Sequence, residues 1–304
     1  MKLAAIDIGS NGVKFLIVRP LELNNPFSKL KKIEFSRLPL RLGDDVFKTK
    51  EISKKKAELL TKSIKAFGLL MDVYNVDYYR ACATSAMRDA ENAEQIIAKI
   101  KEETELKIEI ISGVQESQLI IKSFLHLLEK KSDYIHIDVG GGSTEISHLH
   151  NREVIVTKSF NIGAVRMREG KVKQKAWDEL EEWANNYFAK MGRVKSIGTG
   201  GSMTKLYELA GVKEGSFMSL RKLKNINNKI HKYSQEERVY KLQLNPDRAE
   251  VIDFAGDIYI KILQIVKSNQ IIAPDFGLKD GIVQDMWATF LHNKKSHKLN
   301  TLPK

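Results

Sequence analysis

Two acidic residues stand at the same place in two similar segments of the chain. Asp7 ends an apolar run and precedes the turn residues Gly9-Ser10-Asn11-Gly12. Asp138 also ends an apolar run and precedes Gly140-Gly141-Gly142-Ser143. Glycine lets backbone N–H groups approach a phosphate closely, and a carboxylate supplies the oxygen ligands that Mg²⁺ prefers. Each segment predicts a strand, a tight turn and a second strand. Together they predict two related domains that close on one phosphorylated ligand.

The second segment contains a further carboxylate, Glu145, beyond the glycine turn. If that turn joins paired strands, Asp138 and Glu145 point near the same site. They are therefore the best candidates for Mg²⁺ coordination, and Glu145 is also a candidate for orienting water. Asp7 is their counterpart from the first segment. For each of these residues the alternative is an ordinary polar strand end.

The residues around the turns also predict a phosphate cradle. It combines the backbone amides of Gly141, Gly142 and Ser143, the hydroxyls of Ser143 and Thr144, and the side chains of Asn11 and Arg88 from the first half of the chain. Arg88 follows a predicted strand and can bind a phosphate through two N–H groups at once, which lysine cannot do. The alternative for Arg88 is a surface loop arginine.

Composition limits the class of protein. The chain of 304 residues suits one large domain or two ordinary ones, and its apolar fraction of 42% is enough for real cores. The single Cys82 excludes an intramolecular disulfide, and no apolar run is long enough to span a membrane. The cytoplasm is therefore the expected location.

The net charge of +12 favours polyanionic partners or, equally, a solvated lysine-rich surface. Its basic residues are scattered and match no nucleic-acid motif, so specific nucleic-acid binding is not expected.

Strands alternate with helical patterns along the chain, which predicts an α/β fold. Strands are expected near 2–8, 13–19, 31–39, 77–83, 106–111, 134–138, 145–149, 153–159 and 194–197. Helices are expected over 48–74 and 175–190, after capping residues Asn92 and Ser112, and near the C-terminus from Gly277 to Phe290, with a frayed tail over 293–304. A polar run at 129–133 marks a domain boundary. The expected domains are residues 1–126 and 127–304, with the last helix packing back on the first domain.

Eight segments, in this order, resemble the exopolyphosphatase and guanosine pentaphosphate phosphohydrolase (Ppx/GppA) family. Each is weak alone, but together they span nearly the whole chain. They are AIDIGSNGVKFLIV (5–18), ATSAMRDA (83–90), ISGVQESQLI (111–120), IDVGGGSTEIS (137–147), SFNIGAVRM (159–167), GTGGSMTKL (198–206), NPDRAEVI (245–252) and GLKDGIV (277–283).

The resemblance implies two actin-like domains of the ribonuclease H-like group that also holds sugar kinases and heat-shock ATPases, with an active site in the interdomain cleft. Glu116 matches the family's catalytic glutamate, the proposed general base for the attacking water. The implied activity is Mg²⁺-dependent release of terminal orthophosphate from inorganic polyphosphate, with guanosine pentaphosphate as a second substrate. The resemblance also implies a homodimer and the short, two-domain form of the family.

Two other functions stay open at this point. One is a binding protein for alarmone or polyphosphate that does not hydrolyse its ligand and regulates a partner. The other is an ATP-dependent kinase or ATPase of the same fold group. Intact Glu116, Asp138 and Glu145 argue against the first, and the Glu116 segment with the Arg88 loop argues against the second.

A few further positions are weaker candidates. Gly200 and Gly201 lie where the fold group approaches a nucleotide, and here they are expected mainly to shape the cleft. His148 and His150 share a strand face and are expected on a solvent-facing edge, whereas His136 is expected in the core. The chain departs from the family pattern at several positions, which are Gly12 for the usual Ser, Val114-Gln115 for acidic residues, and Ser117-Gln118 for Ala-Arg.

Overall fold

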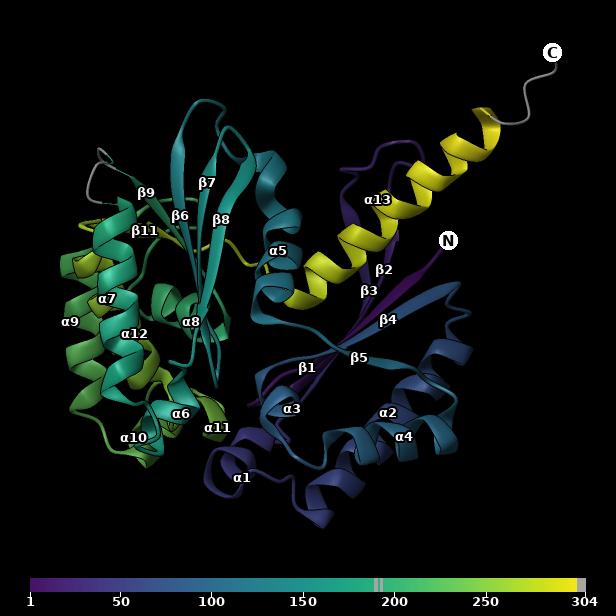
Figure 1. Ribbon diagram of the computed structural model, residues 1–304, viewed down its shortest axis with the longest axis horizontal. Coiled ribbons are helices and arrows are strands. Elements are labelled where there is room, and N and C mark those ends of the chain that lie inside the picture. The colour runs from purple at the N-terminus through teal and green to yellow at the C-terminus, as the bar shows by residue number, and fades with distance from the viewer. Residues whose placement is uncertain (189–190, 192–193, 300–304) are drawn as a thin grey trace.

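Two mixed β-sheets organise the chain, each between layers of helices (Figure 1). The structure is a computed structural model that describes residues 1–188, 191 and 194–299, with side chains up to Lys294. The first sheet has the order β3-β2-β1-β4-β5, and the second has the order β10-β11-β9-β6-β7-β8. The strands of the first sheet are β1 (Leu3–Ile8), β2 (Val13–Pro20), β3 (Leu30–Leu38), β4 (Tyr78–Ala83) and β5 (Ile108–Ile110). Those of the second are β6 (Asp133–Val139), β7 (Thr144–His150), β8 (Glu153–Phe160), β9 (Lys195–Thr199), β10 (Met218–Ser219) and β11 (Gln270–Ile272).

The two sheets share one connectivity, which is the internal repeat that the sequence indicated. In the first, β1, β2 and β3 form an antiparallel meander and β4 then pairs parallel to β1. In the second, β6, β7 and β8 form the meander and β9 pairs parallel to β6. The fold is therefore α/β with two actin-like halves, as predicted.

The helices of the first half are α1 (Leu42–Thr49), α2 (Lys54–Val73), α3 (Ser85–Asp89), α4 (Ala93–Thr104) and α5 (Gly113–Phe124), followed by the 3₁₀ turn η1 (Leu125–Leu127). Those of the second half are α6 (Ala164–Arg168), α7 (Gln174–Phe188), α8 (Gly201–Leu209), α9 (Leu220–His231), α10 (Gln235–Tyr240), α11 (Pro246–Ala249), α12 (Ile252–Ile265) and α13 (Leu278–Leu299). None of the described helices is both long and apolar enough to cross a bilayer.

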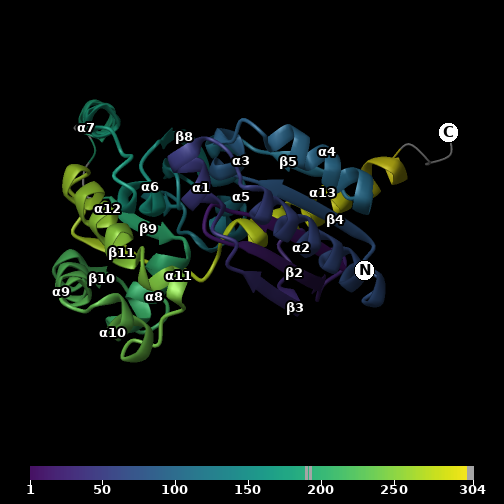
Figure 2. The same cartoon turned by 90° about the horizontal axis from the view of Figure 1, so that it is seen from below.

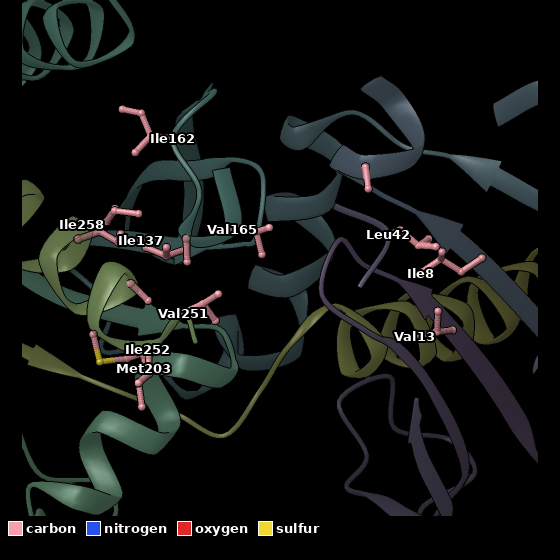
Figure 3. Close-up of a cluster of buried hydrophobic side chains, with 14 of the residues drawn as sticks. Ile8, Val13, Leu42, Ile137, Ile162, Val165, Met203, Val251, Ile252 and Ile258 are labelled. Atoms are coloured by element: carbon pink, nitrogen blue, oxygen red, sulfur yellow. The ribbon is translucent and has the colours of Figure 1, made fainter. Parts of the chain in front are cut away.

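The faces of the first sheet are covered by different helices because side chains alternate along each strand. Ile6 and Ile8 of β1 pack with α2 in one buried cluster, and Leu3 and Ala5 pack with α13 in another. Figure 2 shows α2 and α13 on opposite sides of this sheet. The cluster that contains Ile6 and Ile8 is the larger of the two and includes residues from both halves of the molecule, as Figure 3 shows.

Two helices, α5 and α13, fill the space between the sheets (Figure 1). Helix α5 contacts β7 and β8, and α13 contacts α5 and β1. A Cβ on Gly281 of α13 would lie 2.0 Å from the Leu119 carbonyl oxygen of α5, so this close crossing requires glycine. The last helix thus lies against strands of the first half of the chain. The division into domains at 126/127 falls within η1 and stays a prediction.

Helix α5 begins where the sequence indicated, at a capping box. The Ser112 hydroxyl accepts from the Gln115 N–H, and the Gln115 side chain accepts from the Ser112 N–H. This cap fixes the first helical turn, in which Glu116 lies.

Other boundaries differ from the sequence-based expectation. The helix expected over 48–74 is α2, which begins only at Lys54, after the capping residue Ser53. Residues 42–49 form the separate helix α1, which was not predicted and which ends where Lys50 adopts a positive φ of 65°. The loop after β4 contains the short helix α3, and the last helix continues to Leu299. Helices α9 and α10 and strand β11 were not predicted, and residues 189–190, 192–193 and 300–304 lie outside the described part of the chain.

Candidate active site

The two glycine turns lie in contact at a cavity of about 410 Å³ between the halves of the molecule. The N–H of Gly9 donates to the Gly12 carbonyl at 3.1 Å, and that of Gly140 donates to the Ser143 carbonyl at 2.9 Å. A Cβ on Gly141 would lie 2.9 Å from the Cβ of Ser10, so glycine is required for the turns to approach this closely. We call this cavity the cleft.

Several of the predicted site residues line the cleft together, namely Asp7, Asn11, Glu116, Asp138, Gly141 and Ser143. Glu145 is 1% exposed and pairs across the strands with Asp138, so it lies directly behind the cleft wall. Arg88 reaches the same place from α3, with Nη1 3.4 Å from Glu116 Oε2 and Nη2 3.4 Å from Ser143 Oγ. Thr144 is fully buried and its hydroxyl donates to the Ile162 carbonyl, so it supports the turn from beneath.

Three carboxylates gather here, and burial is the largest cause of a raised pKa at each of them. Burial, and then the charge of Asp138, raises the pKa of Glu145 to about 7, although a hydrogen bond from Ser159 opposes the shift. Burial, and then the charges of Glu145 and Asp138, raises the pKa of Glu116 well above its usual value, against the pull of Arg88. Burial also raises the pKa of Asp138. Burial, and then the neighbouring carboxylates, therefore outweighs the helix dipole at Glu116, which alone would lower the pKa of this residue.

Asp138 and Glu145 suit a hydrated divalent cation. Glu145 Oε1 accepts from Ser159 at 2.7 Å, whereas its Oε2 is buried with no partner among the described residues. An unpartnered buried carboxylate oxygen is costly unless a cation or proton satisfies it. No group of three His, Cys, Asp or Glu side chains among the described residues could hold a metal alone. Two carboxylates nevertheless fit Mg²⁺, which usually takes its remaining ligands from water and substrate phosphate.

The first hairpin has a different charge arrangement. Asp7 pairs across the strands with Lys14, and the Lys14 ammonium lies 2.8 Å from Asp7 Oδ2. Burial acts to lower the pKa of Lys14, but the Asp7 carboxylate beside it outweighs burial and leaves that pKa raised. The carboxylate of Asp7 is therefore already compensated within the protein.

A chain of buried hydrogen bonds holds Asp138 from below. The Thr199 hydroxyl donates to Asp138 Oδ1, and His136 Nε2 lies 2.8 Å from the same hydroxyl. Because that hydroxyl donates to the carboxylate, His136 must donate to it through Nε2–H. Burial lowers the pKa of His136 to about 3, which keeps the imidazole neutral. His136 is fully buried, as predicted, and it contacts Ser117, the residue that departs from the family pattern.

The structure places Asn11 in a bridge between the halves. Its amide nitrogen lies 3.0 Å from Asp247 Oδ2 in α11, and its Oδ1 is buried without a partner among the described residues. Arg37 pairs with the same Asp247 carboxylate. Gly12 lies beside this pair, since a Cβ there would be 3.3 Å from the Arg37 Nη2 atom. The departure from serine at Gly12 thus leaves room for Arg37.

Sequence reasoning missed four cationic side chains that line the cleft, namely Lys14, Arg37, Arg248 and Lys279. Arg248 lies over the Gly200–Gly201 turn, because a Cβ on Gly201 would be 2.6 Å from its Nη2 atom. Burial, and then the nearby Arg37, lowers the pKa of Arg248. The sequence signal that could have indicated Arg248 is its place in the segment NPDRAEVI, at the start of a helix, and we had assigned no role to this arginine.

The expectation for His148 was wrong. It is 5% exposed and lies beneath α7, with Nε2 2.8 Å from Asp133 and Nδ1 3.1 Å from the Tyr187 hydroxyl. Strand β8 forms the edge of the sheet, so β7 has a neighbouring strand on each side, β6 and β8. His150 remains half exposed and contacts the same Asp133.

The fold and cleft define a protein with two actin-like halves and an acidic, glycine-lined site between them. Residues 27–290 match the model of the Ppx/GppA phosphatase family. The chain therefore belongs to this family, as the eight segments predicted.

Curated relatives cover most of the chain. A bifunctional 3-dehydroquinate synthase/phosphatase of Fusobacterium nucleatum is 30% identical over 286 residues, which is 85% of this chain and 42% of the relative. A guanosine-5′-triphosphate,3′-diphosphate pyrophosphatase of Photobacterium profundum is 24% identical over 95% of this chain and 60% of its own length. The chain thus spans about half the length of the curated relatives it matches.

Solved structures match the whole fold. The Aquifex aeolicus Ppx/GppA family member is 26% identical with a TM-score of 0.76, over 95% of this chain and 98% of that chain. An exopolyphosphatase from Cytophaga hutchinsonii has a TM-score of 0.82 at 20% identity, over 95% of this chain and 98% of that chain, and supports the fold alone.

Proposed function

We propose that this protein is a Mg²⁺-dependent phosphohydrolase that releases terminal orthophosphate from inorganic polyphosphate or guanosine pentaphosphate. The observation that carries the proposal is the cluster of Glu116, Asp138 and Glu145 beside the Gly140–Ser143 turn. The names of two curated relatives supply the substrate class. They are the guanosine-5′-triphosphate,3′-diphosphate pyrophosphatase described above and an exopolyphosphatase 1 of Mycobacterium tuberculosis, which is 29% identical over 55% of this chain and 48% of its own length.

Asp138 and Glu145 would hold the cation, and Asp7 would contact its hydration shell. Bound Mg²⁺ supplies positive charge that offsets the negative charge of the phosphoryl oxygens. The unpartnered Glu145 Oε2 and the mutual repulsion of these carboxylates support this assignment.

Glu116 would act as the general base. Its pKa is raised toward neutral pH, and a general base is most effective when its pKa lies near the pH at which the enzyme works. It takes a proton from a water whose oxygen bonds to the terminal phosphorus. The bridging P–O bond breaks, and its electron pair leaves with the shortened phosphate chain.

The phosphate would lie against the turn amides of Gly141, Gly142 and Ser143. The carbonyls of these glycines are fixed by α6, since Val165 N–H donates to Gly141 and Arg166 Nε donates to Gly142. Arg88 and the Ser143 hydroxyl would complete the cradle. The Asn11 side chain, which was predicted to join them, directs its amide N–H groups to Asp247 instead. Lys14 and Arg248 add positive charge for the following phosphates.

Location in the cytoplasm, which rests on the cysteine content and hydropathy of the sequence, and a homodimeric state, which rests on the family resemblance, are further parts of this proposal. The net charge of +12 would steer a polyanionic substrate to the protein, so activity should fall as salt increases.

The test is orthophosphate release from tripolyphosphate and from guanosine pentaphosphate in Mg²⁺. Glu116→Gln should lower kcat by roughly 10²- to 10⁴-fold, as expected for loss of a general base. Glu94→Gln, in the first turn of α4, is the matched control and should retain activity. No release by the unaltered protein from either substrate would reject hydrolysis and favour the binding protein.

A further inference from the structure

A second cavity, of about 570 Å³, opens beside the cleft. The two cavities share four lining residues, Phe35, Asp275, Phe276 and Lys279. We call the second one the side pocket. It lies between β2, β3 and the 21–29 loop on one side and η1 and α13 on the other. Its volume is in the range of about 300–1,000 Å³ that is usual for small-molecule sites.

The lining of the side pocket is largely apolar and aromatic. Leu16 and Val18 of β2 contribute to it, with Phe27, Phe35 and Phe276 as its aromatic residues. A phosphate chain has no apolar surface and gains nothing from such a lining. The side pocket therefore suits a ligand that carries an aromatic group as well as phosphate.

The aromatic rings are available to a ligand. The 21–29 loop is tied to α13 by other groups, since Trp287 Nε1 donates to the Asn25 carbonyl at 2.8 Å and Gln284 Nε2 to the Pro26 carbonyl at 2.6 Å. Phe27 is not needed for these ties, and its side chain remains 58% exposed while stacking on His126 at 5.6 Å.

Polar groups in the side pocket also lack partners within the protein. His126 Nδ1 is buried with no hydrogen-bond partner among the described residues. Burial, and then Arg152, lowers the pKa of His126, so the imidazole is neutral near pH 7. Such a ring can hydrogen-bond the edge of a base.

Three lysines, Lys29, Lys32 and Lys279, line the same pocket together with two aspartates, Asp275 and Asp280. Lys32 and Lys279 lie over the Phe35 ring, at 5.8 Å and 5.5 Å from its centroid. Lys29 and Lys32 form no salt bridge with any described carboxylate, whereas Lys279 contacts Asp280 at 2.6 Å. Positive charge is thus available close to the aromatic surface.

We propose that the side pocket binds the nucleoside of guanosine pentaphosphate, with its lysines meeting the second phosphate arm while the other arm enters the cleft. This rests on the proposed function, because the cleft must hold the reacting phosphates. A nucleotide with 5′ and 3′ phosphate arms combines an aromatic base with two anionic groups, as the two adjoining cavities require. Inorganic polyphosphate would use the cleft without the side pocket.

The experiment measures equilibrium binding by calorimetry, in Ca²⁺ to slow turnover, for guanosine pentaphosphate and tripolyphosphate. The variants are Lys32→Ala and Phe27→Ala. The matched controls are Lys31→Ala, the neighbouring exposed lysine of β3, and Phe217→Ala, an exposed phenylalanine elsewhere. Each test variant should weaken nucleotide binding about five- to tenfold relative to tripolyphosphate binding, and the controls should not.

Unchanged nucleotide affinity in both test variants would overturn the proposal. Weaker binding of tripolyphosphate by the same factor would also overturn it, because the lysines would then serve any polyanion. Orthophosphate release from tripolyphosphate, measured on the same preparations in Mg²⁺, reports separately on the proposed hydrolysis. If the unaltered protein released no orthophosphate, the proposed hydrolysis would be rejected, and the binding measurements would still test the side pocket.

Discussion

The β1–β2 and β6–β7 hairpins have the same backbone design but opposite charge. In each, an aspartate precedes a four-residue turn whose first N–H donates to its fourth carbonyl. The residue paired with the aspartate is Lys14 in the first hairpin and Glu145 in the second. The first hairpin is therefore neutralised by its own lysine, whereas the second leaves two carboxylates to be neutralised from outside. This difference is the reason that the proposed function places the cation at the second hairpin.

The largest effect is expected when the residue paired with the aspartate in the second hairpin, Glu145, is replaced by lysine, as in the first hairpin. Glu145→Lys should lower orthophosphate release by at least about 10³-fold at any Mg²⁺ concentration. The lysine ammonium would occupy the place of the cation but could not coordinate water and phosphate oxygens as Mg²⁺ does. Glu153→Lys, an exposed glutamate of β8, is the control. Activity of Glu145→Lys within tenfold of the unaltered protein would contradict the assignment.

The reciprocal change tests whether Lys14 neutralises Asp7. Lys14→Met leaves a buried carboxylate unpaired, so the free energy of unfolding should fall by about 2–3 kcal/mol, less than for a fully buried pair because Lys14 is partly exposed. Urea unfolding in the absence of Mg²⁺ measures this. Adding Asp7→Asn should restore part of the loss. A double variant less stable than Lys14→Met would refute the pairing.

A smaller effect concerns pH. The pKa of Glu145 is raised to about 7 in the folded protein, above its value in the unfolded chain. The stability that the protonated carboxyl contributes is therefore present below about pH 4.5 and is lost as pH rises through about 7. Without Mg²⁺, thermal unfolding should occur several degrees lower at pH 8 than at pH 5.5, and Glu145→Gln should reduce that difference. An equal difference in this variant would contradict the role of Glu145.

The sequence predicted the parts of the site that depend on local pattern. Asp138 and Glu145 are cross-strand neighbours because a turn joins their strands, which glycine spacing indicates. The capping box at Ser112 likewise placed Glu116 in a first helical turn. These features need only short segments of chain.

What the sequence did not predict depends on contacts between distant segments. The bridge from Asn11 to Asp247 follows from how the halves pack. The position of Arg248 over Gly201 and the burial of His148 beneath α7 follow from packing within the second half. The break at Lys50 was missed because it depends on a positive φ at a lysine, which the spacing of apolar residues does not indicate. The side pocket also needs β2, β3, the 21–29 loop, η1 and α13 to come together.

The most direct test of the account is Mg²⁺ affinity, measured by calorimetry without substrate, for the unaltered protein, Asp7→Asn and Glu145→Gln. If the second hairpin holds the cation, Glu145→Gln should weaken Mg²⁺ binding at least about tenfold, and Asp7→Asn should weaken it far less. Equal losses in both variants, or a larger loss in Asp7→Asn, would contradict the division of roles between the two hairpins.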